Sequence, residues 1–434
     1  MDFATLLLFC AALTGCVALG WSILYPLLFG FLLFCLYGRW KRVSWRALLR
    51  AAWGGIRTIQ SLIVVFLLIG MLTALWRAAG TVPVIVCYAA RLIRPAVFLL
   101  MAFLLNCGVS LLMGTSFGTA ATMGVICATM GAAMGVSPVW TGGAVLAGAF
   151  FGDRCAPVST SALLVCELTG TDLFSNIRAM LRASLVPTLL ACAVYLAAGI
   201  ALPAAGDGVD IRAIFAQEFD LYWLALLPAA AILVLSVFRV NVKAAMSVSI
   251  GAAFILCLTL QHDSLAGTLR LMLLGYRAAA PDVAAMLDGG GIVSMVNVTA
   301  IVALSSSYAG LFEATGLLDN LQRGVSKLAR RATPHGAIAC TALLTSIVGC
   351  NQTFAIILTH QLCRGVEPEP ESMALALEDT AVVIAPLVPW SIAAAVPLST
   401  IGAPSSGILT ACFLYLLPLW HVLTHRKTHS AARL

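Results

Sequence analysis

Long apolar runs are the feature that most constrains how this chain can fold. Each run is long enough to form a helix in or near a bilayer, where about 20 apolar residues span the hydrocarbon core. Lipid offers the backbone no hydrogen-bond partners, so we expect these runs to be helices. The runs lie at about 3–19, 21–38, 56–76, 95–113, 117–135, 139–151, 180–203, 221–238, 244–260, 292–315, 336–349 and 404–424.

The composition agrees with a polytopic membrane protein. Of the 434 residues, 61% are apolar and only 10% are charged, whereas roughly 25% are charged in a typical soluble domain. So few charges cannot coat a soluble surface, which excludes a soluble enzyme, a disordered chain and a nucleic-acid-binding protein. We therefore predict an all-α polytopic membrane protein with about 10–12 transmembrane segments.

Four further apolar segments are short or rich in Gly and Pro, at 82–93, 155–168, 352–363 and 379–402. Interrupted segments of this kind are typical of re-entrant hairpins and broken helices in secondary transporters. The net charge of +7 comes from basic clusters at 39–50, 239–243, 323–331 and in the C-terminal tail. Cytoplasmic loops carry an excess of Lys and Arg, so we expect both termini in the cytoplasm.

The two halves of the chain contain an internal repeat. Gly54-Gly55-Ile56 recurs as Gly290-Gly291-Ile292, and the spacing from Gly55 to Gly80 and from Gly291 to Gly316 is 25 residues in both copies. The basic cluster precedes the first copy but follows the second, which predicts an inverted-topology repeat. Chance similarity between two apolar helices is the alternative.

The repeat suggests a division of the chain into four parts. We expect a helical hairpin with its basic loop at 1–50 and a first inverted repeat at 51–205. Connecting helices and loops follow at 206–288, and a second inverted repeat with the C-terminal helix at 289–434.

Three acidic residues lie next to apolar segments and are functional candidates, since a buried acid costs about 2.5–3.5 kcal/mol on insertion. Each acidic site precedes an Ala-Pro step, and proline frees helix carbonyls. A freed carbonyl beside a carboxylate and hydroxyls suits a hard cation. The predicted ion- and proton-binding residues are Asp153, Ser159, Thr160, Ser161, Glu378, Asp379 and Thr380, with Asp153 and Asp379 as Na⁺ ligands.

The alternative is that these acids sit at a membrane edge. Asp153 then pairs with Arg154, and Glu378 continues the acidic loop that contains Glu367, Glu369 and Glu371. In that interpretation the acids have no role in transport.

Two polar, glycine-containing stretches interrupt the apolar chain, one starting at Gly114 and the other at Gly349. Gly114 follows Gly80 at nearly the same spacing as Gly349 follows Gly316, so the two stretches are candidate repeat partners. Close helix packing alone is the alternative explanation for their small residues. The residues that we predict to contact the substrate are Thr115, Ser116, Asn297, Asn351 and Gln352.

These motifs, in this order, resemble the NhaC-type Na⁺/H⁺ antiporter family over nearly the whole chain. The similar segments are 114–121, 148–159, 289–297, Asn351-Gln352 and 377–390. The resemblance implies the ion-transporter superfamily, with inverted repeats, paired re-entrant hairpins and a homodimer in a bacterial cytoplasmic membrane. Family members exchange Na⁺ for H⁺, and some relatives exchange malate for lactate. This sequence has Thr160 where an Asp is common and Leu163 where an Asn is common.

We predict a Na⁺/H⁺ antiporter that works by alternating access. A carboxylate removed from water holds its proton more tightly, so H⁺ and Na⁺ can compete for one site. The alternative is a Na⁺- or H⁺-coupled transporter or exchanger of a small organic acid such as malate or lactate, which the departure at Thr160 favours. No Walker or HExxH motif occurs, so we expect no enzyme and no cofactor. The expected partners are membrane lipid and the small transported solute.

Overall fold

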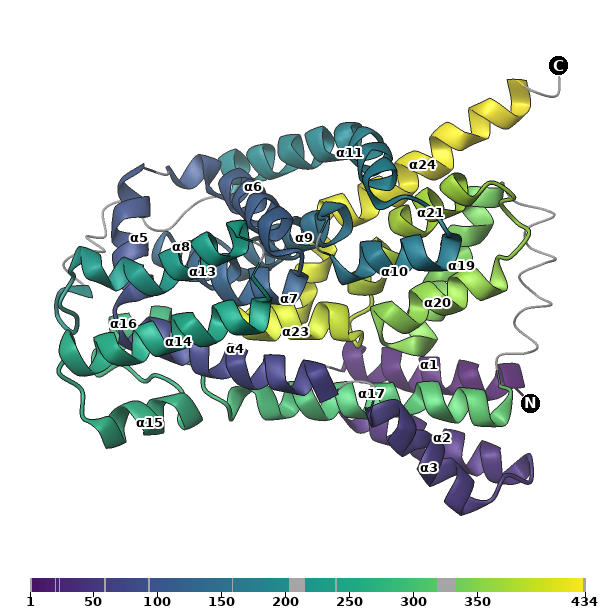
Figure 1. Cartoon of the computed structure of the whole chain (residues 1–434), viewed down its shortest axis with the longest axis horizontal. Helices are drawn as coiled ribbons and strands as arrows, with labels where there is room; N and C mark the ends of the chain where they lie inside the picture. Colours follow the sequence, from purple (N-terminus) through teal and green to yellow (C-terminus); the bar gives the residue numbers. More distant parts are fainter. Residues whose placement is uncertain are drawn as a thin grey trace.

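Helices make up the whole of the regular structure described by the computed structural model. It describes residues 2–431 except 20, 23, 58–59, 93, 158, 203–214, 239 and 318–332. Within these residues there is no β-strand, only an isolated bridge between Tyr276 and Gly289. The predicted all-α fold is therefore confirmed (Figure 1).

The described helices of the first half extend to residue 201. They are α1 (Asp2–Ala18), α2 (Leu24–Trp40), α3 (Trp45–Arg57), α4 (Gln60–Ala78), α5 (Thr81–Leu92), α6 (Pro95–Met113), α7 (Ser116–Thr119), the π-helical turn η1 (Ala120–Gly124), α8 (Val125–Ala133), α9 (Pro138–Cys155), α10 (Thr160–Thr169) and α11 (Leu173–Ala201).

The second half begins with a short 3₁₀ helix. Its described helices are η2 (Trp223–Leu226), α13 (Leu227–Val237), α14 (Val242–Thr259), α15 (Leu265–Leu274), α16 (Pro281–Leu287), α17 (Ser294–Thr315), α19 (Pro334–Gly349), α20 (Gln352–Leu362), α21 (Pro370–Asp379), α22 (Ala381–Ile384), η3 (Ala385–Leu387), α23 (Ile392–Thr400), η4 (Ser405–Thr410) and α24 (Cys412–Ala431).

Five of the described helices are long and apolar enough to cross a membrane alone, and two bent pairs bring the number to seven. One bent pair joins α4 to α5 at 63°, and the other joins α21 to α23 at 56°. Large apolar side chains are exposed along α2, α11, α13 and α14, including Leu32, Leu189 and Val237. Such surfaces suit lipid, so this is a multi-pass membrane protein. The count of about 10–12 crossings, which needs shorter helices as well, stays a prediction.

Two pairs of helices reverse direction at turns with nearly the same backbone. α6 ends at Gly114 (φ 63°, ψ 26°), and α19 ends at Cys350 (φ 53°, ψ 7°). The next residue is extended in both turns, and it is Thr115 in the first and Asn351 in the second. Both α6 and α19 also begin with a proline.

The spacing to these turns corrects one prediction by a single position. Gly80 and Gly316 both have positive φ, 78° and 62°. The step along the chain from Gly80 to Gly114 equals the step from Gly316 to Cys350, whereas Gly349 comes one position too early. In backbone conformation and spacing, Gly114 therefore corresponds to Cys350 rather than to Gly349. The inverted orientation of the two copies stays a prediction.

Small residues allow the central helices to approach closely. The spacing of Gly148 and Gly152 places both on the face of α9 that packs against α6, where an added Cβ would collide with α6 backbone atoms. Close contact of this kind is what a Gly-xxx-Gly spacing permits in membrane helices. This packing holds α9, and with it Asp153, against the turn at Gly114.

Candidate functional site

The two turns lie beside a cavity of about 440 Å³ in the middle of the molecule. In Figure 1 the helices α6 and α8 lie on one side of this centre, α19 and α20 on the other, and α7 and α23 between them. The cavity is lined by six of the residues predicted from the sequence: Thr115, Ser116, Asp153, Thr160, Asn351 and Gln352. Residues far apart in the chain thus meet at one site.

Asp153 is the carboxylate of this cavity, and its side chain is only 4% exposed. The Gln352 amide donates from Nε2 to Asp153 Oδ2 across 3.4 Å. The Ser161 hydroxyl lies 3.0 Å from the Asp153 carbonyl oxygen and 3.4 Å from Oδ2. The backbone amide of Ser116 also faces this carboxylate. Polar groups from both halves of the chain therefore surround a buried acid.

The break between α9 and α10 supplies the neighbouring hydroxyls. Ser159 caps α10 by accepting hydrogen bonds from the backbone amides of Ser161 and Ala162. The Ser159 and Ser161 hydroxyls are 2.8 Å apart, and both side chains are buried. Thr160 points to the cavity instead and is exposed to it. The structure thus places Ser161 and Thr160 on different sides of the same turn.

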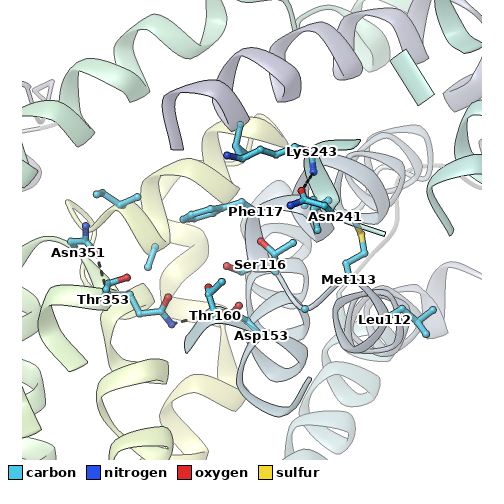
Figure 2. Close-up of a pocket in the computed structure, with 18 of the residues that line it drawn as sticks. Leu112, Met113, Ser116, Phe117, Asp153, Thr160, Asn241, Lys243, Asn351 and Thr353 are labelled. Carbon is cyan, nitrogen blue, oxygen red and sulfur yellow. Dashed lines mark hydrogen bonds between the residues drawn. The ribbon is translucent and has the colours of Figure 1, made fainter. Parts of the chain in front are cut away.

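Figure 2 shows further polar residues in the cavity wall that the sequence did not indicate as site residues. Asn241 is the N-cap of α14 and Lys243 lies in its first turn, and Thr353 follows the second turn. Asn241 accepts a hydrogen bond from the Lys243 backbone amide at 2.9 Å. Lys243 was assigned to a cytoplasmic basic cluster from its position between apolar runs. Its place in the wall means that its charge faces the same cavity as Asp153.

Glu378 and Asp379 lie outside the cavity wall, in a separate buried cluster. Asp379 forms an ion pair with Arg154, and both side chains are fully buried. Arg154 also donates to the Met180 carbonyl oxygen at 3.3 Å. Glu378 is 1% exposed, and neither of its carboxylate oxygens has a hydrogen-bond partner among the described residues. Arg154 therefore pairs across the molecule, not with its neighbour Asp153.

The same cluster contains the one group of described residues with metal-like geometry. His335, Asp379 and His421 are buried, and one potential ligand atom from each lies within 4.8 Å of the others. His421 Nδ1 is 3.1 Å from Asp379 Oδ2. Imidazole ligands suit transition metals, whereas Na⁺ as a hard cation favours oxygen ligands. This group does not resemble a sodium site.

The two remaining predicted residues lie apart from the cavity. Thr380 is buried at the break after α21 (φ −124°, ψ −76°), and its hydroxyl donates to the Ala376 carbonyl oxygen at 2.6 Å. Asn297 is exposed on α17 and does not line the cavity. The structure thus brings together the residues of the first half with Asn351 and Gln352, but not with Thr380 or Asn297.

Comparison with known proteins agrees with this architecture. A family described as the Na⁺/H⁺ antiporter family matches residues 4–169 and 151–423. The chain belongs to the Na⁺/H⁺ antiporter family. It is therefore a secondary antiporter and not an enzyme, as the sequence predicted.

Relatives that are named for different substrates match most of this chain. The Na(+)/H(+) antiporter NhaC of Alkalihalophilus pseudofirmus is 27% identical, over 92% of this chain and 88% of the relative. The arginine/ornithine antiporter ArcD of Halobacterium salinarum is 26% identical, over 93% and 86%. The malate-2H(+)/Na(+)-lactate antiporter of Bacillus subtilis is 25% identical, over 87% and 81%. Family membership alone therefore does not select one solute.

Proposed function

We propose that the protein exchanges Na⁺ for H⁺ and that Asp153 carries both ions in alternation. The observation that carries this proposal is the position of Asp153, the one carboxylate among the described residues that line the central cavity. Its neighbours offer hydroxyl, amide and carbonyl oxygens, the ligand types that hard cations prefer. A single carboxylate that holds either ion gives exchange without any input of ATP.

Asp379 supports this site indirectly in our proposal. Its ion pair holds Arg154, the residue next to Asp153, so the guanidinium is turned away from the cavity. Glu378 and Thr380 belong to the same support, because they flank Asp379 in the chain and are buried with it. The role that we predicted for Asp379 as a direct Na⁺ ligand thus requires Arg154 to leave it during the transport cycle.

A second candidate function is the exchange of a small organic solute with ion coupling. The cavity of about 440 Å³ far exceeds the roughly 30 Å³ that one water occupies in the liquid. Lys243 gives its wall a positive charge, and Asn241, Asn351 and Gln352 give it amide groups. These groups suit a carboxylate-bearing solute. The relatives named as arginine/ornithine and malate/lactate antiporters support this alternative.

The decisive experiment measures flux in proteoliposomes. Proteoliposomes that contain the wild-type protein and enclose a pH-sensitive dye should show proton movement when Na⁺ is added. Asp153→Asn should abolish this proton movement, because the variant lacks the titrating carboxylate. Glu371→Gln, which changes an exposed acid at the start of α21, is the matched control and should exchange at the wild-type rate. Asp153→Asn protein that exchanges Na⁺ normally would falsify the Asp153 mechanism.

The same preparation separates the two candidate functions. Malate, lactate, arginine and ornithine are applied in turn with and without Na⁺. Proton movement on addition of Na⁺ alone supports ion exchange. Proton or Na⁺ movement that depends on one of the organic solutes supports the second candidate.

We also propose that the protein lies in a bacterial cytoplasmic membrane as a homodimer, with inverted repeats and both termini in the cytoplasm. The basic clusters support this orientation, and the similar turns at Gly114 and Cys350 support the repeat. In intact cells an impermeant thiol reagent should label Asp220→Cys but not Arg42→Cys, on a background without reactive native cysteines. The opposite labelling pattern would reverse the orientation.

A further inference from the structure

A second cavity, of about 240 Å³, lies at the opposite end of the helices that form the central one. Helix α9 contributes Asp153 to the central cavity and Thr141 to the second. The stretch of α9 between them corresponds to about 18 Å of helix. Residues at the ends of α4 and α23, and residues of α8, also line this second cavity or lie beside it. In Figure 1 the second cavity is at the end of the molecule where α8 and α16 lie.

Arg77 lines this second cavity from the end of α4. Its side chain is only 7% exposed. Among the described residues, none forms a hydrogen bond with its Nε atom, and no carboxylate lies within the ion-pair distance of 4.0 Å. Asp288 lines the same cavity and acts on Arg77 only at longer range. Buried charges in proteins are normally paired, so this guanidinium lacks the partner that its burial requires.

The first turn of α9 adds a second attraction for an anion. Pro138, Thr141 and Gly142 line the cavity at the start of this helix of 18 residues. Ser137 at the N-cap makes no side-chain capping bond. The N-terminus of a helix carries a partial positive charge that favours bound anions. Here the attraction comes from this dipole, because Pro138 has no amide N–H and the Thr141 amide already donates to the Ser137 carbonyl oxygen. Arg77 and the N-terminus of α9 therefore both line the second cavity, and both favour an anion there.

We propose that Arg77 binds the carboxylate group of a small solute in this second cavity. Guanidinium groups bind carboxylates through paired, charge-assisted hydrogen bonds. Asp288, on the same wall, disfavours a second negative charge and favours an ammonium group. The solute that fits both residues is a zwitterionic amino acid, followed by a monocarboxylate.

Binding of the solute at Arg77 does not require the proposed antiporter function. Only a role of this solute in transport rests on that function. Binding at Arg77 does not depend on Asp153, which lies at the other end of α9. Loss of Na⁺/H⁺ exchange in Asp153→Asn protein and loss of carboxylate binding in Arg77 variants are therefore separate outcomes.

Direct binding to the purified full-length protein tests the proposal. Calorimetric titrations in Na⁺-free choline buffer use L-arginine, L-alanine, L-lactate and L-malate, with chloride and phosphate as inorganic anions. The amino acids should bind most tightly. Arg77→Gln should weaken this binding about tenfold or more, the size expected for losing a hydrogen bond to a charged group. Arg77→Lys should keep part of it.

Three controls make the result specific. Arg178→Gln removes an exposed arginine from α11 and should bind as wild type. Asp288→Asn should weaken binding of the amino acids and strengthen that of lactate. Glu371→Gln, which changes an exposed acid of α21, should also bind the amino acids as wild type does.

A measurement on the wild-type protein covers the case in which the Arg77 variants do not fold. Phenylglyoxal modifies arginine, and mass spectrometry reports the modified peptide. A bound carboxylate should slow modification of Arg77 but not of Arg178. The proposal is overturned if no carboxylate binds, if Arg77→Gln binds normally, if chloride or phosphate binds as tightly as the carboxylates, or if Arg77 is never protected.

Discussion

Asp153 and Asp379 occupy similar places in the sequence, each shortly before an Ala-Pro step, yet their surroundings differ. Asp153 lines a cavity, and its carboxylate accepts hydrogen bonds from amide and hydroxyl groups. Asp379 is fully buried beside Arg154 and His421. In our proposal the first carboxylate receives a mobile ion, whereas the second is already paired with a fixed cation. Similar motifs in two halves of a chain therefore do not imply equal roles.

The largest effect that sharpens this comparison is expected at Asp379. Asp379→Asn leaves Arg154 buried without its ion-pair partner, and removing one partner of a buried pair costs about 3–5 kcal/mol. Thermal unfolding of the purified protein should show this loss, and Asp153→Asn should unfold close to the wild-type temperature. Equal stability of the two variants would remove the distinction between the acids.

A second variant shows whether loss of the ion pair causes the lower stability of Asp379→Asn. Adding Arg154→Gln to Asp379→Asn removes both charges, so part of the lost stability should return. In the double-mutant cycle the two changes should be strongly non-additive, because the residues are in direct contact. Additive losses would mean that Asp379 stabilises the protein through other neighbours.

A smaller effect is expected at Ser161, which contacts Asp153. Ser161→Ala removes a hydroxyl that lies within hydrogen-bond distance of Asp153, an interaction worth about 0.5–1.5 kcal/mol. The concentration of Na⁺ needed for half-maximal exchange should rise by about two- to tenfold. Thr169→Val, which removes a hydroxyl bonded only within α10 and to Thr171, is the control. An unchanged Na⁺ dependence would place the ion away from Ser161.

The smallest effect is expected at Glu378. Its carboxylate has no hydrogen-bond partner among the described residues, and Gln has nearly the same shape. Glu378→Gln should therefore change stability by no more than about 1 kcal/mol and should retain Na⁺-dependent proton movement. Complete loss of exchange would make Glu378, rather than Asp153, the carrier of the proton.

Local chemistry allowed much of the architecture and half of the site to be predicted. Hydropathy identified the helices, because each must bury its own backbone hydrogen bonds in lipid. Gly114 was correctly expected at a break, since glycine adopts positive φ without strain. Cys350 also has positive φ, and a non-glycine residue in that conformation gives no such signal, so the sequence indicated Gly349 rather than Cys350 as the counterpart of Gly114.

The pairing of Arg154 with Asp379 was not predictable from the sequence. The two residues are 225 positions apart, and neither their spacing nor their neighbours indicates a contact. Lys243 was missed for another reason, because a basic residue between two apolar runs is typical of a cytoplasmic loop. Asn297 was expected to contact the substrate, but it is exposed on α17 and does not line the cavity. Side-chain direction in these cases depends on how distant helices pack.

The ion pair between Arg154 and Asp379 also has a mechanical consequence. It ties the last turn of α9 to the last turn of α21 in the buried interior. Spin labels at Leu163 and Glu371, both exposed on the helices α10 and α21, should therefore keep a constant separation when Na⁺ or acid is added. A constant separation would show that the two broken helices move as a single rigid body, which would place the hinges of the proposed transport cycle in the elements that surround them.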